Sequence, residues 1–134
     1  MNYELKIYID GASRGNPGPA GIGIVVEALE GNVIRRHREY IGEATNNVAE
    51  YKALIKALEI ARELKAKYIN VYSDSDLIVK QVNEVYRVKN ENLRKLCKEA
   101  LSLKNNFKKV NILSIPRGQN KAANKLSEIA IDLR

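Results

Sequence analysis

The sequence has little of several residue types, and each scarcity excludes a class of protein. It contains no tryptophan, one cysteine and one histidine in 134 residues. The single cysteine, Cys97, cannot form a disulfide within the chain, so a disulfide-stabilised extracellular domain is excluded and we expect a cytoplasmic protein. No apolar run is long enough for a membrane span and no signal-peptide pattern is recognisable, so we expect no membrane association. The histidine, His37, lies among arginines in a predicted strand, which favours a solvated surface role over catalysis.

Positive charge is what the chain has in excess. Lysines and arginines number 23 against 16 acidic residues, which gives a net charge of +7. Such an excess favours a polyanionic partner such as a nucleic acid. No internal repeat or low-complexity tract interrupts the chain, and its length suffices for one hydrophobic core. We therefore predict a single domain over residues 1–134.

The most informative stretch runs from Ile7 to Val26, IYIDGASRGNPGPAGIGIVV. It predicts a buried strand, a glycine-rich hairpin turn and a second buried strand, in which Gly21 and Gly23 allow close backbone approach. The first strand is expected to end on Asp10, although a lone aspartate at a strand end is often only a turn former. The turn, rich in small residues, would let a polyanion approach closely. The residues expected to share the buried face of the first strand are Tyr3, Leu5, Ile7 and Ile9.

A strongly helical run follows Thr45, with Asn46 or Asn47 as the natural N-cap. Its apolar residues recur at helical spacing, at positions 53, 54, 57, 58, 61 and 64. One turn before Leu54 the same stripe reaches Glu50, so this carboxylate is expected to face inward. Buried acids are rare unless they are paired or bind a metal. A glutamate in the first turn also interacts favourably with the helix dipole, which is the competing interpretation.

The segment Tyr68–Ser73 predicts a short buried strand that ends at Asp74. A strand, a helix and a strand in succession imply a crossover, so this strand should lie parallel to the first. Ligands of open α/β sheets bind beyond the carboxyl ends of parallel strands, where Asp10 and Asp74 are both expected. An N-cap role for Asp74 in the next helix is the alternative.

The remaining patterns complete an α/β fold. An arginine-rich strand at 33–41 is polar enough for the sheet edge, and a fifth strand is expected at 110–115. Helices are expected at about 77–84, 91–105 and 121–134. The order is βββαβααβα, a five-stranded mixed sheet with helices on both faces. The residues expected to point inward from the last helix are Leu126, Ile129, Ala130 and Leu133.

Four segments of the chain resemble motifs of type 1 ribonuclease H. They are IYIDGASRGNPGPAGIG, TNNVAEYKALIKAL, INVYSDSDLIV and IPRGQNKAANKLSEIA, in this order over almost the whole length. The short connector at 85–90 is similar to family members that lack a basic protrusion. The resemblance implies a ribonuclease H-like fold and an endonuclease that hydrolyses the RNA strand of RNA–DNA hybrids, leaving 5′-phosphate and 3′-hydroxyl ends.

Family members hold two divalent metal ions with four acids, and the resemblance carries three of them over to Asp10, Glu50 and Asp74. The fourth position is taken by Asn124. An asparagine can offer a carbonyl oxygen but brings no charge, so we expect weaker metal binding and impaired cleavage. Glu128, one turn further along the helix, is a second candidate that starts from a shifted position. Mg²⁺ is the expected ion, with Mn²⁺ as a substitute.

The same resemblance suggests which residues contact the nucleic acid. The backbone of the Gly11–Gly15 turn and the side chains of Asn46 and Asn47 are placed to read the 2′-hydroxyl, which distinguishes RNA from DNA. Lys89 is a further candidate for a phosphate contact, with a solvated surface role as the equal alternative. The full set of nucleic-acid-binding candidates is Gly11, Ser13, Arg14, Asn16, Thr45, Asn46, Asn47, Arg117 and Asn120.

Two other functions remain open from the sequence. With Asn124, the chain could be a module that binds hybrids and cuts them slowly or not at all. It could also be a related nuclease that acts on double-stranded RNA as well. A generic nucleotide-binding domain is disfavoured, because GASRGNPG precedes a strand rather than a helix. We expect the protein to be a monomer.

Overall fold

A five-stranded mixed sheet forms the middle layer of the computed structural model, which describes residues 4–134. The strands are β1 (Glu4–Ser13), β2 (Gly18–Ala28), β3 (Val33–Ala44), β4 (Tyr68–Ser73) and β5 (Lys109–Ser114). Their order in the sheet is β3-β2-β1-β4-β5, with β1 antiparallel to β2 and parallel to β4. The mixed sheet and the edge position of β3 are thereby confirmed. Tyr3 lies outside the described residues.

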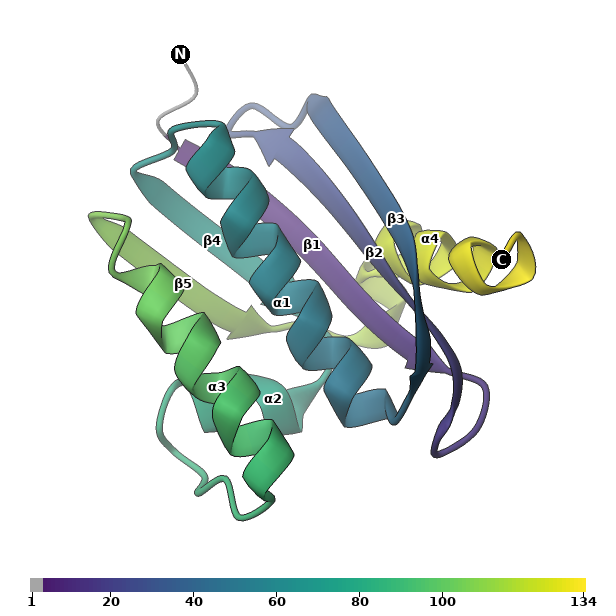
Figure 1. The fold of residues 1–134 in the computed structure, drawn as a ribbon. Coiled ribbons are helices and arrows are strands. Elements are labelled where there is room, and N and C mark those ends of the chain that lie inside the picture. Colours follow the sequence, from purple (N-terminus) through teal and green to yellow (C-terminus); the bar gives the residue numbers. More distant parts are fainter. Residues whose placement is uncertain (1–3) are drawn as a thin grey trace.

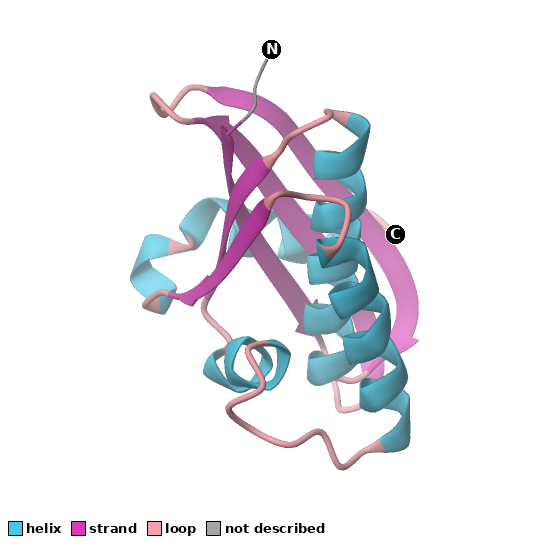
Figure 2. Ribbon diagram, turned by 90° about the vertical axis from the view of Figure 1, so that its left-hand side faces the viewer, coloured by secondary structure: helices cyan, strands magenta, loops and turns pink. Residues whose placement is uncertain are grey.

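Helices cover both faces of the sheet. Their bounds are α1 (Asn46–Glu63), α2 (Asp76–Val82), α3 (Glu91–Lys104) and α4 (Lys121–Asp132), with a short 3-10 turn, η1 (Arg117–Gln119), before α4. Figure 1 and Figure 2 show α1 and α3 side by side on one face and α4 on the other, which confirms the predicted layers and the order βββαβααβα. Within residues 4–134, no helix has the length and apolarity needed to cross a membrane.

The main hydrophobic core lies between the sheet and α1. Leu5, Ile7 and Ile9 are buried as predicted, and most of the predicted stripe of α1 is buried against them. Tyr51 and Ile60 are buried as well, because α3 packs on a second side of α1. Enclosure on two sides fixes α1 firmly, and with it the position of Glu50 near its start.

The first strand does not end where the sequence indicated. β1 continues past Asp10 to Ser13 because the glycine-rich segment stays paired with β2, where Ser13 is opposite Ala20. Its pairing with β4, by contrast, ends at Ile9 and Ser73. The prediction that the strand ends on Asp10 is therefore correct only on the β4 side. There the two parallel strands separate and leave room for side chains between them.

The predicted N-cap of α1 is wrong, and the alternative N-cap role of Asp74 is wrong as well. The N-cap of α1 is Thr45, whose hydroxyl accepts a hydrogen bond from the Val48 N–H at 3.2 Å. Asn46 and Asn47 are therefore released from the capping role. In α2 the cap is Ser75 rather than Asp74. The Asp74 side chain is consequently also free for another task.

The C-terminal helix packs partly through the residues expected, since Leu126 and Ile129 are half-buried, and partly through others. Leu133 is exposed, because α4 ends at Asp132, and Ile131 is buried in its place. Ala130 is buried as predicted. Small residues dominate this face, so α4 can lie very close to the sheet.

Two glycines set the closest approaches between helices and sheet. A Cβ atom on Gly11 would lie 2.2 Å from the Ala49 carbonyl carbon of α1. A Cβ atom on Gly23, which is opposite Asp10 in the sheet, would lie 2.2 Å from the Ala123 carbonyl oxygen of α4. The predicted close approach at Gly23 is thus confirmed. Around Asp10, both helices pack directly on the backbone of the sheet.

Candidate active site

Three carboxylates from separate segments meet at the carboxyl ends of β1 and β4. One oxygen from each of Asp10, Glu50 and Asp74 lies within 4.8 Å of the other two. Asp10 comes from β1, Glu50 from the first turns of α1, and Asp74 directly follows β4. The separation of β1 from β4 and the close approach of α1 at Gly11 together allow this convergence.

Asp10 and Glu50 are buried and Asp74 is half-buried, and burial dominates the electrostatics of the first two. It raises the pKa of Asp10 from 3.8 to about 6, with the Asp74 carboxylate adding to the rise and a hydrogen bond from Ser127 opposing it. Burial also raises the pKa of Glu50 well above its usual value, and the neighbouring Asp10 adds to this. Clustered carboxylates of this kind are stabilised by a bound cation, and carboxylate oxygens are the ligands that Mg²⁺ prefers. The donor set therefore fits a divalent metal ion.

Glu50 is held in place from the backbone of β1. The N–H of Gly11 donates to Glu50 Oε1 at 2.6 Å in a buried hydrogen bond. This bond lowers the pKa of Glu50 and so opposes the effect of burial. It also means that the Gly11 N–H is not free to meet a nucleic acid.

The helix α4 reaches Asp10 from the other face of the sheet. Asn124 Nδ2 donates to Asp10 Oδ2 at 3.0 Å, and the Ser127 hydroxyl donates to the same oxygen at 2.7 Å. Ser127 is completely buried and was missed in the sequence. Its spacing of three residues from Asn124 was the available signal, because residues three apart share a helix face. Glu128 is exposed and lines the cleft, but it does not belong to the acidic group found among residues 4–134.

Asn120 supports the site from inside the protein. Its Nδ2 donates to the Ile9 carbonyl oxygen at 2.8 Å and to Asp74 Oδ2 at 3.1 Å. It therefore ties Asp74 to the last residue of β1 that pairs with β4. With 1% of its surface exposed, Asn120 cannot contact a nucleic acid as expected, and its place is that of a positioning residue.

The glycine-rich turn is bound to the start of α1 by its own polar groups. The Ser13 N–H donates to Asn46 Oδ1 at 2.8 Å, and the Ser13 hydroxyl donates to the Ala44 carbonyl oxygen at 2.7 Å. The Asn46 N–H donates to Asn16 Oδ1 at 3.2 Å. The expected free backbone donors of this turn are thus partly used within the protein. These hydrogen bonds fix the turn in position at the edge of the cleft, beside the acids.

A cleft of about 430 Å³ opens above the acids. Asn47 and Arg117 line it, and neither side chain makes a hydrogen bond to residues 4–134. Arg117 lowers the pKa of both Asp10 and Glu50 through its positive charge. Arg14 also lines the cleft, but it is paired with Asp132 of α4. Asn47 and Arg117 are therefore the predicted contact residues that remain most available.

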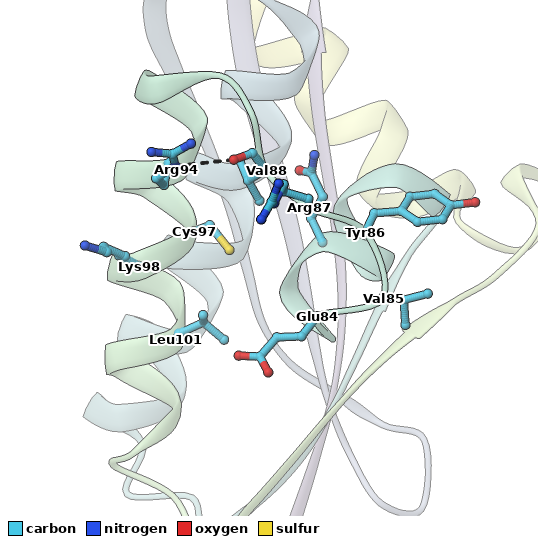
Figure 3. Close-up of a pocket in the computed structure, with 10 residues that line it drawn as sticks. Glu84, Val85, Tyr86, Arg87, Val88, Arg94, Cys97, Lys98 and Leu101 are labelled. Atoms are coloured by element: carbon cyan, nitrogen blue, oxygen red, sulfur yellow. Dashed lines mark hydrogen bonds between the residues drawn. The ribbon is translucent and has the colours of Figure 1, made fainter.

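A second hollow, of about 480 Å³, lies between α3 and the connector that follows α2, and it shares no residue with the acidic cleft. Figure 3 shows Cys97 and Leu101 pointing toward it from α3, with the connector opposite. Arg94 Nε donates to the Val88 carbonyl oxygen at 3.3 Å, which holds the connector against α3. The lining also includes Arg87, so the short connector retains positive charge.

Comparison with known proteins extends over the whole fold. Residues 8–130 match the family model described as reverse transcriptase-like. A ribonuclease HI of Halobacterium salinarum is 40% identical over 129 residues, covering 96% of this chain and 65% of the relative. The bifunctional protein Rv2228c of Mycobacterium tuberculosis is 43% identical over 130 residues, covering 96% of this chain. The chain spans only 36% of the length of that mycobacterial relative.

Solved structures agree with these relatives. The crystal structure of RNase H1 from Halobacterium salinarum superposes with a TM-score of 0.96 at 38% identity, covering 98% of this chain and 99% of the other. LC11-RNase H1, solved in complex with an RNA/DNA hybrid, superposes with a TM-score of 0.92 at 41% identity. In that pair the coverage is 96% of this chain and 97% of the other.

Proposed function

The chain belongs to the type 1 ribonuclease H family, and from this premise we propose that it hydrolyses the RNA strand of RNA–DNA hybrids as a metal-dependent endonuclease. The observation that carries the proposal is the convergence of Asp10, Glu50 and Asp74 within 4.8 Å at the base of a cleft. It is supported by the 41% identity to a structure that contains an RNA/DNA hybrid.

Asp10, Glu50 and Asp74 are the residues that would hold Mg²⁺, or Mn²⁺ in its place. Two ions bound there would supply activation of the attacking water and charge stabilisation at the leaving 3′ oxygen. The protein's own contribution is to hold the carboxylates in place: Gly11 fixes Glu50, and Asn120 fixes Asp74. Fixed ligands lower the cost of binding the ions and the substrate together.

Asn124 is the reason to propose that cleavage is impaired. Its amide nitrogen donates to Asp10, so the side chain acts as a hydrogen-bond donor where the family pattern has an anionic ligand. The site therefore has three carboxylates and one neutral amide. Loss of groups next to a metal typically weakens metal binding or activity by about 10–100-fold.

Substrate binding is proposed to involve the free polar side chains of the cleft and its positive rim. Arg117 is suited to a backbone phosphate, because it is exposed and makes no hydrogen bond within residues 4–134. Asn47 is suited to the 2′-hydroxyl, since its amide can both donate and accept. A polyanion would be attracted to both by the net charge of +7.

A second candidate function is a module that binds hybrids with little or no cleavage. The specific observation that favours it is again Asn124, which leaves the family's fourth acidic position without charge. Activity on double-stranded RNA is a further variant of the proposal, because such a duplex also carries 2′-hydroxyls on the strand to be cut.

The test is cleavage of an end-labelled RNA–DNA hybrid at millimolar Mg²⁺. The chain is expected to cut the RNA strand, and Asp10→Asn is expected to abolish cleavage while leaving hybrid binding largely intact. Glu50→Gln is likewise expected to abolish cleavage. Its control is Glu63→Gln, which makes the same chemical change at an exposed position at the far end of α1. Equal cleavage by Asp10→Asn would refute the assignment of the site. Hybrid binding without any cleavage by the unmodified chain would favour the second function.

A further inference from the structure

A smaller hollow, of about 200 Å³, lies between the sheet and the start of α4. Tyr8, Val25 and Glu27 line it from β1 and β2, and Ala122 and Ala123 line it from α4. It shares no residue with the acidic cleft. We call this hollow the Tyr8 pocket. Sites for drug-sized ligands typically measure about 300–1,000 Å³, so the Tyr8 pocket suits a smaller group, such as one flat ring.

One wall of the Tyr8 pocket is aromatic, and its neighbours are apolar. Tyr8 stacks on Tyr72 of β4 with ring centroids 5.0 Å apart, which holds the ring in place. Because β4 and β2 flank β1 on opposite sides, the other face of the Tyr8 ring is left toward β2, where Val25 is its partner in the sheet. A fixed aromatic face beside apolar side chains is a platform on which a flat ring can stack.

The polar groups around this platform are acceptors without partners. Glu27 makes no hydrogen bond or ion pair to residues 4–134. Burial raises the pKa of Tyr8 and the charge of Glu27 adds to the rise, so the carboxylate lies close to the ring. Asn120 is in the inner wall, and its Oδ1 is the one buried side-chain N or O atom of residues 4–134 without a hydrogen-bond partner. Its Nδ2 is already used by Ile9 and Asp74. Both acceptors give the wall a negative potential, which favours a ring whose edge carries N–H donors.

Three cations lie around the pocket. Arg36 on β3 is opposite Val25, Lys6 lies two residues before the aromatic ring on the same face of β1, and Lys121 begins α4. None of the three makes a hydrogen bond or an ion pair to residues 4–134, although Lys6 is opposite Glu27 in the sheet. Free cations around a stacking platform suit the phosphates that accompany a nucleobase.

From this arrangement we propose that the Tyr8 pocket binds one unpaired nucleobase that carries an exocyclic amine. The base stacks on Tyr8, and its amine donates to Glu27, as the cytosine amine does to carboxylates in nucleic-acid recognition. The phosphates of its strand lie against Lys6, Arg36 and Lys121. Thymine and uracil carry no such amine and bind more weakly. The inference goes beyond the proposed function and does not depend on it, because a chain that does not cleave hybrids can still bind a single strand.

The experiment compares labelled single strands of oligo-deoxycytidine and oligo-deoxythymidine bound to the full chain, by fluorescence anisotropy in EDTA. The unmodified chain is expected to bind the cytidine strand at least about fivefold more tightly. Glu27→Gln introduces an amide that pairs with either kind of ring edge, so the two strands should then bind equally. Glu30→Gln is the matched control, because it makes the same change at an exposed position in the turn between β2 and β3, outside the pocket. It should keep the preference.

The stacking platform is tested by Tyr8→Ala, which should weaken the binding of both strands by at least about fivefold. Tyr40→Ala is its control, because Tyr40 is an exposed tyrosine of β3 that does not line the pocket. Urea denaturation checks that each variant is folded. If Tyr8→Ala does not fold, the comparison of Glu27→Gln with Glu30→Gln decides the question.

Free nucleotides separate two sources of the base. Excess dCMP should displace the cytidine strand more effectively than dTMP does, and equal displacement by both would overturn the inference. The strand should bind more tightly than dCMP, because its further phosphates meet the three cations. A strand that binds no more tightly would refute the role of the cations and make a free nucleotide the ligand.

Equal affinities of the unmodified chain for the two strands would overturn the inference, as would an undiminished preference in a folded Glu27→Gln variant. An intact preference together with no cleavage of RNA–DNA hybrids would refute the proposed function alone. Cleavage without a preference would refute this inference alone.

Discussion

Neutralising Asp10 should stabilise the metal-free protein even though it destroys the proposed active site. Burial raises the pKa of this carboxyl from 3.8 to about 6. For an acid, a raised pKa in the folded state means that ionisation destabilises the fold, so stability falls as pH rises from about 3.8 to about 6. At 1.36 kcal/mol for each step of pKa, the full penalty above this window is about 3 kcal/mol.

The perturbation is Asp10→Asn, which removes the charge and keeps the shape. The free energy of unfolding is measured by urea denaturation in EDTA between pH 4 and pH 8. Near pH 4 the variant and the unmodified chain should differ little, because folded Asp10 is then protonated and the unfolded residue is only about half ionised. Above pH 6 the variant should be more stable by up to about 3 kcal/mol. Added Mg²⁺ should reduce or reverse this difference, since only the unmodified chain retains all three carboxylates.

Asp132→Asn provides a control with the opposite sign. The exposed Asp132 is paired with Arg14, and the hydrogen bond from Arg14 lowers its pKa. Its ionised form therefore favours folding, and the substitution should destabilise slightly at neutral pH, with the effect lost as pH falls through the pKa of Asp132. A destabilised Asp10→Asn at pH 7.5, or a difference that does not change with pH, would refute the electrostatic reasoning.

Three further predictions concern the surroundings of Asp10. Asn124→Asp should accelerate cleavage of a labelled hybrid in Mg²⁺ by about 10–100-fold; equal rates would show that position 124 does not contribute a metal ligand. Asn120→Ala should weaken Mn²⁺ binding, measured by calorimetry, because Asp74 loses its link to the Ile9 carbonyl; unchanged affinity would contradict its positioning role. Gly23→Ala should lower the free energy of unfolding in urea by more than about 2 kcal/mol, because its Cβ would lie 2.2 Å from a backbone oxygen of α4; a smaller loss would mean that α4 can move away freely.

The acids were predictable because each leaves a local mark in the sequence. Asp10 and Asp74 follow apolar strand patterns, and Glu50 lies on the apolar stripe of a helix, so strand ends and helical periodicity were sufficient. The choice of caps was not predictable in the same way. Thr45, Asn46 and Asn47 are all good capping residues, and the structure selects Thr45 because Asn46 is engaged by Ser13.

The supporting contacts depended on how distant segments pack. Ser127 lies 117 residues from Asp10 in the sequence, and Asn120 lies 111 residues from Ile9. Apart from the three-residue spacing of Ser127 from Asn124, nothing local indicates either partner, because each contact exists only once α4 has packed on the sheet. The exposure of Leu133 has the same origin, since the exact end of α4 decides whether that residue reaches the sheet.

Because the helices pack closely at Gly11 and Gly23, a change that lowers the stability of the protein need not change the geometry of its site. At the level of Asp10 the backbones of α1 and α4 lie directly against the sheet, in addition to the apolar packing along the rest of α1. A core change such as Ile7→Val typically lowers the free energy of unfolding by about 1 kcal/mol. It should then reduce the folded fraction, while the three carboxylates of each folded molecule keep their positions. The hydrophobic core can therefore adapt to a different working temperature without a new arrangement of the metal ligands.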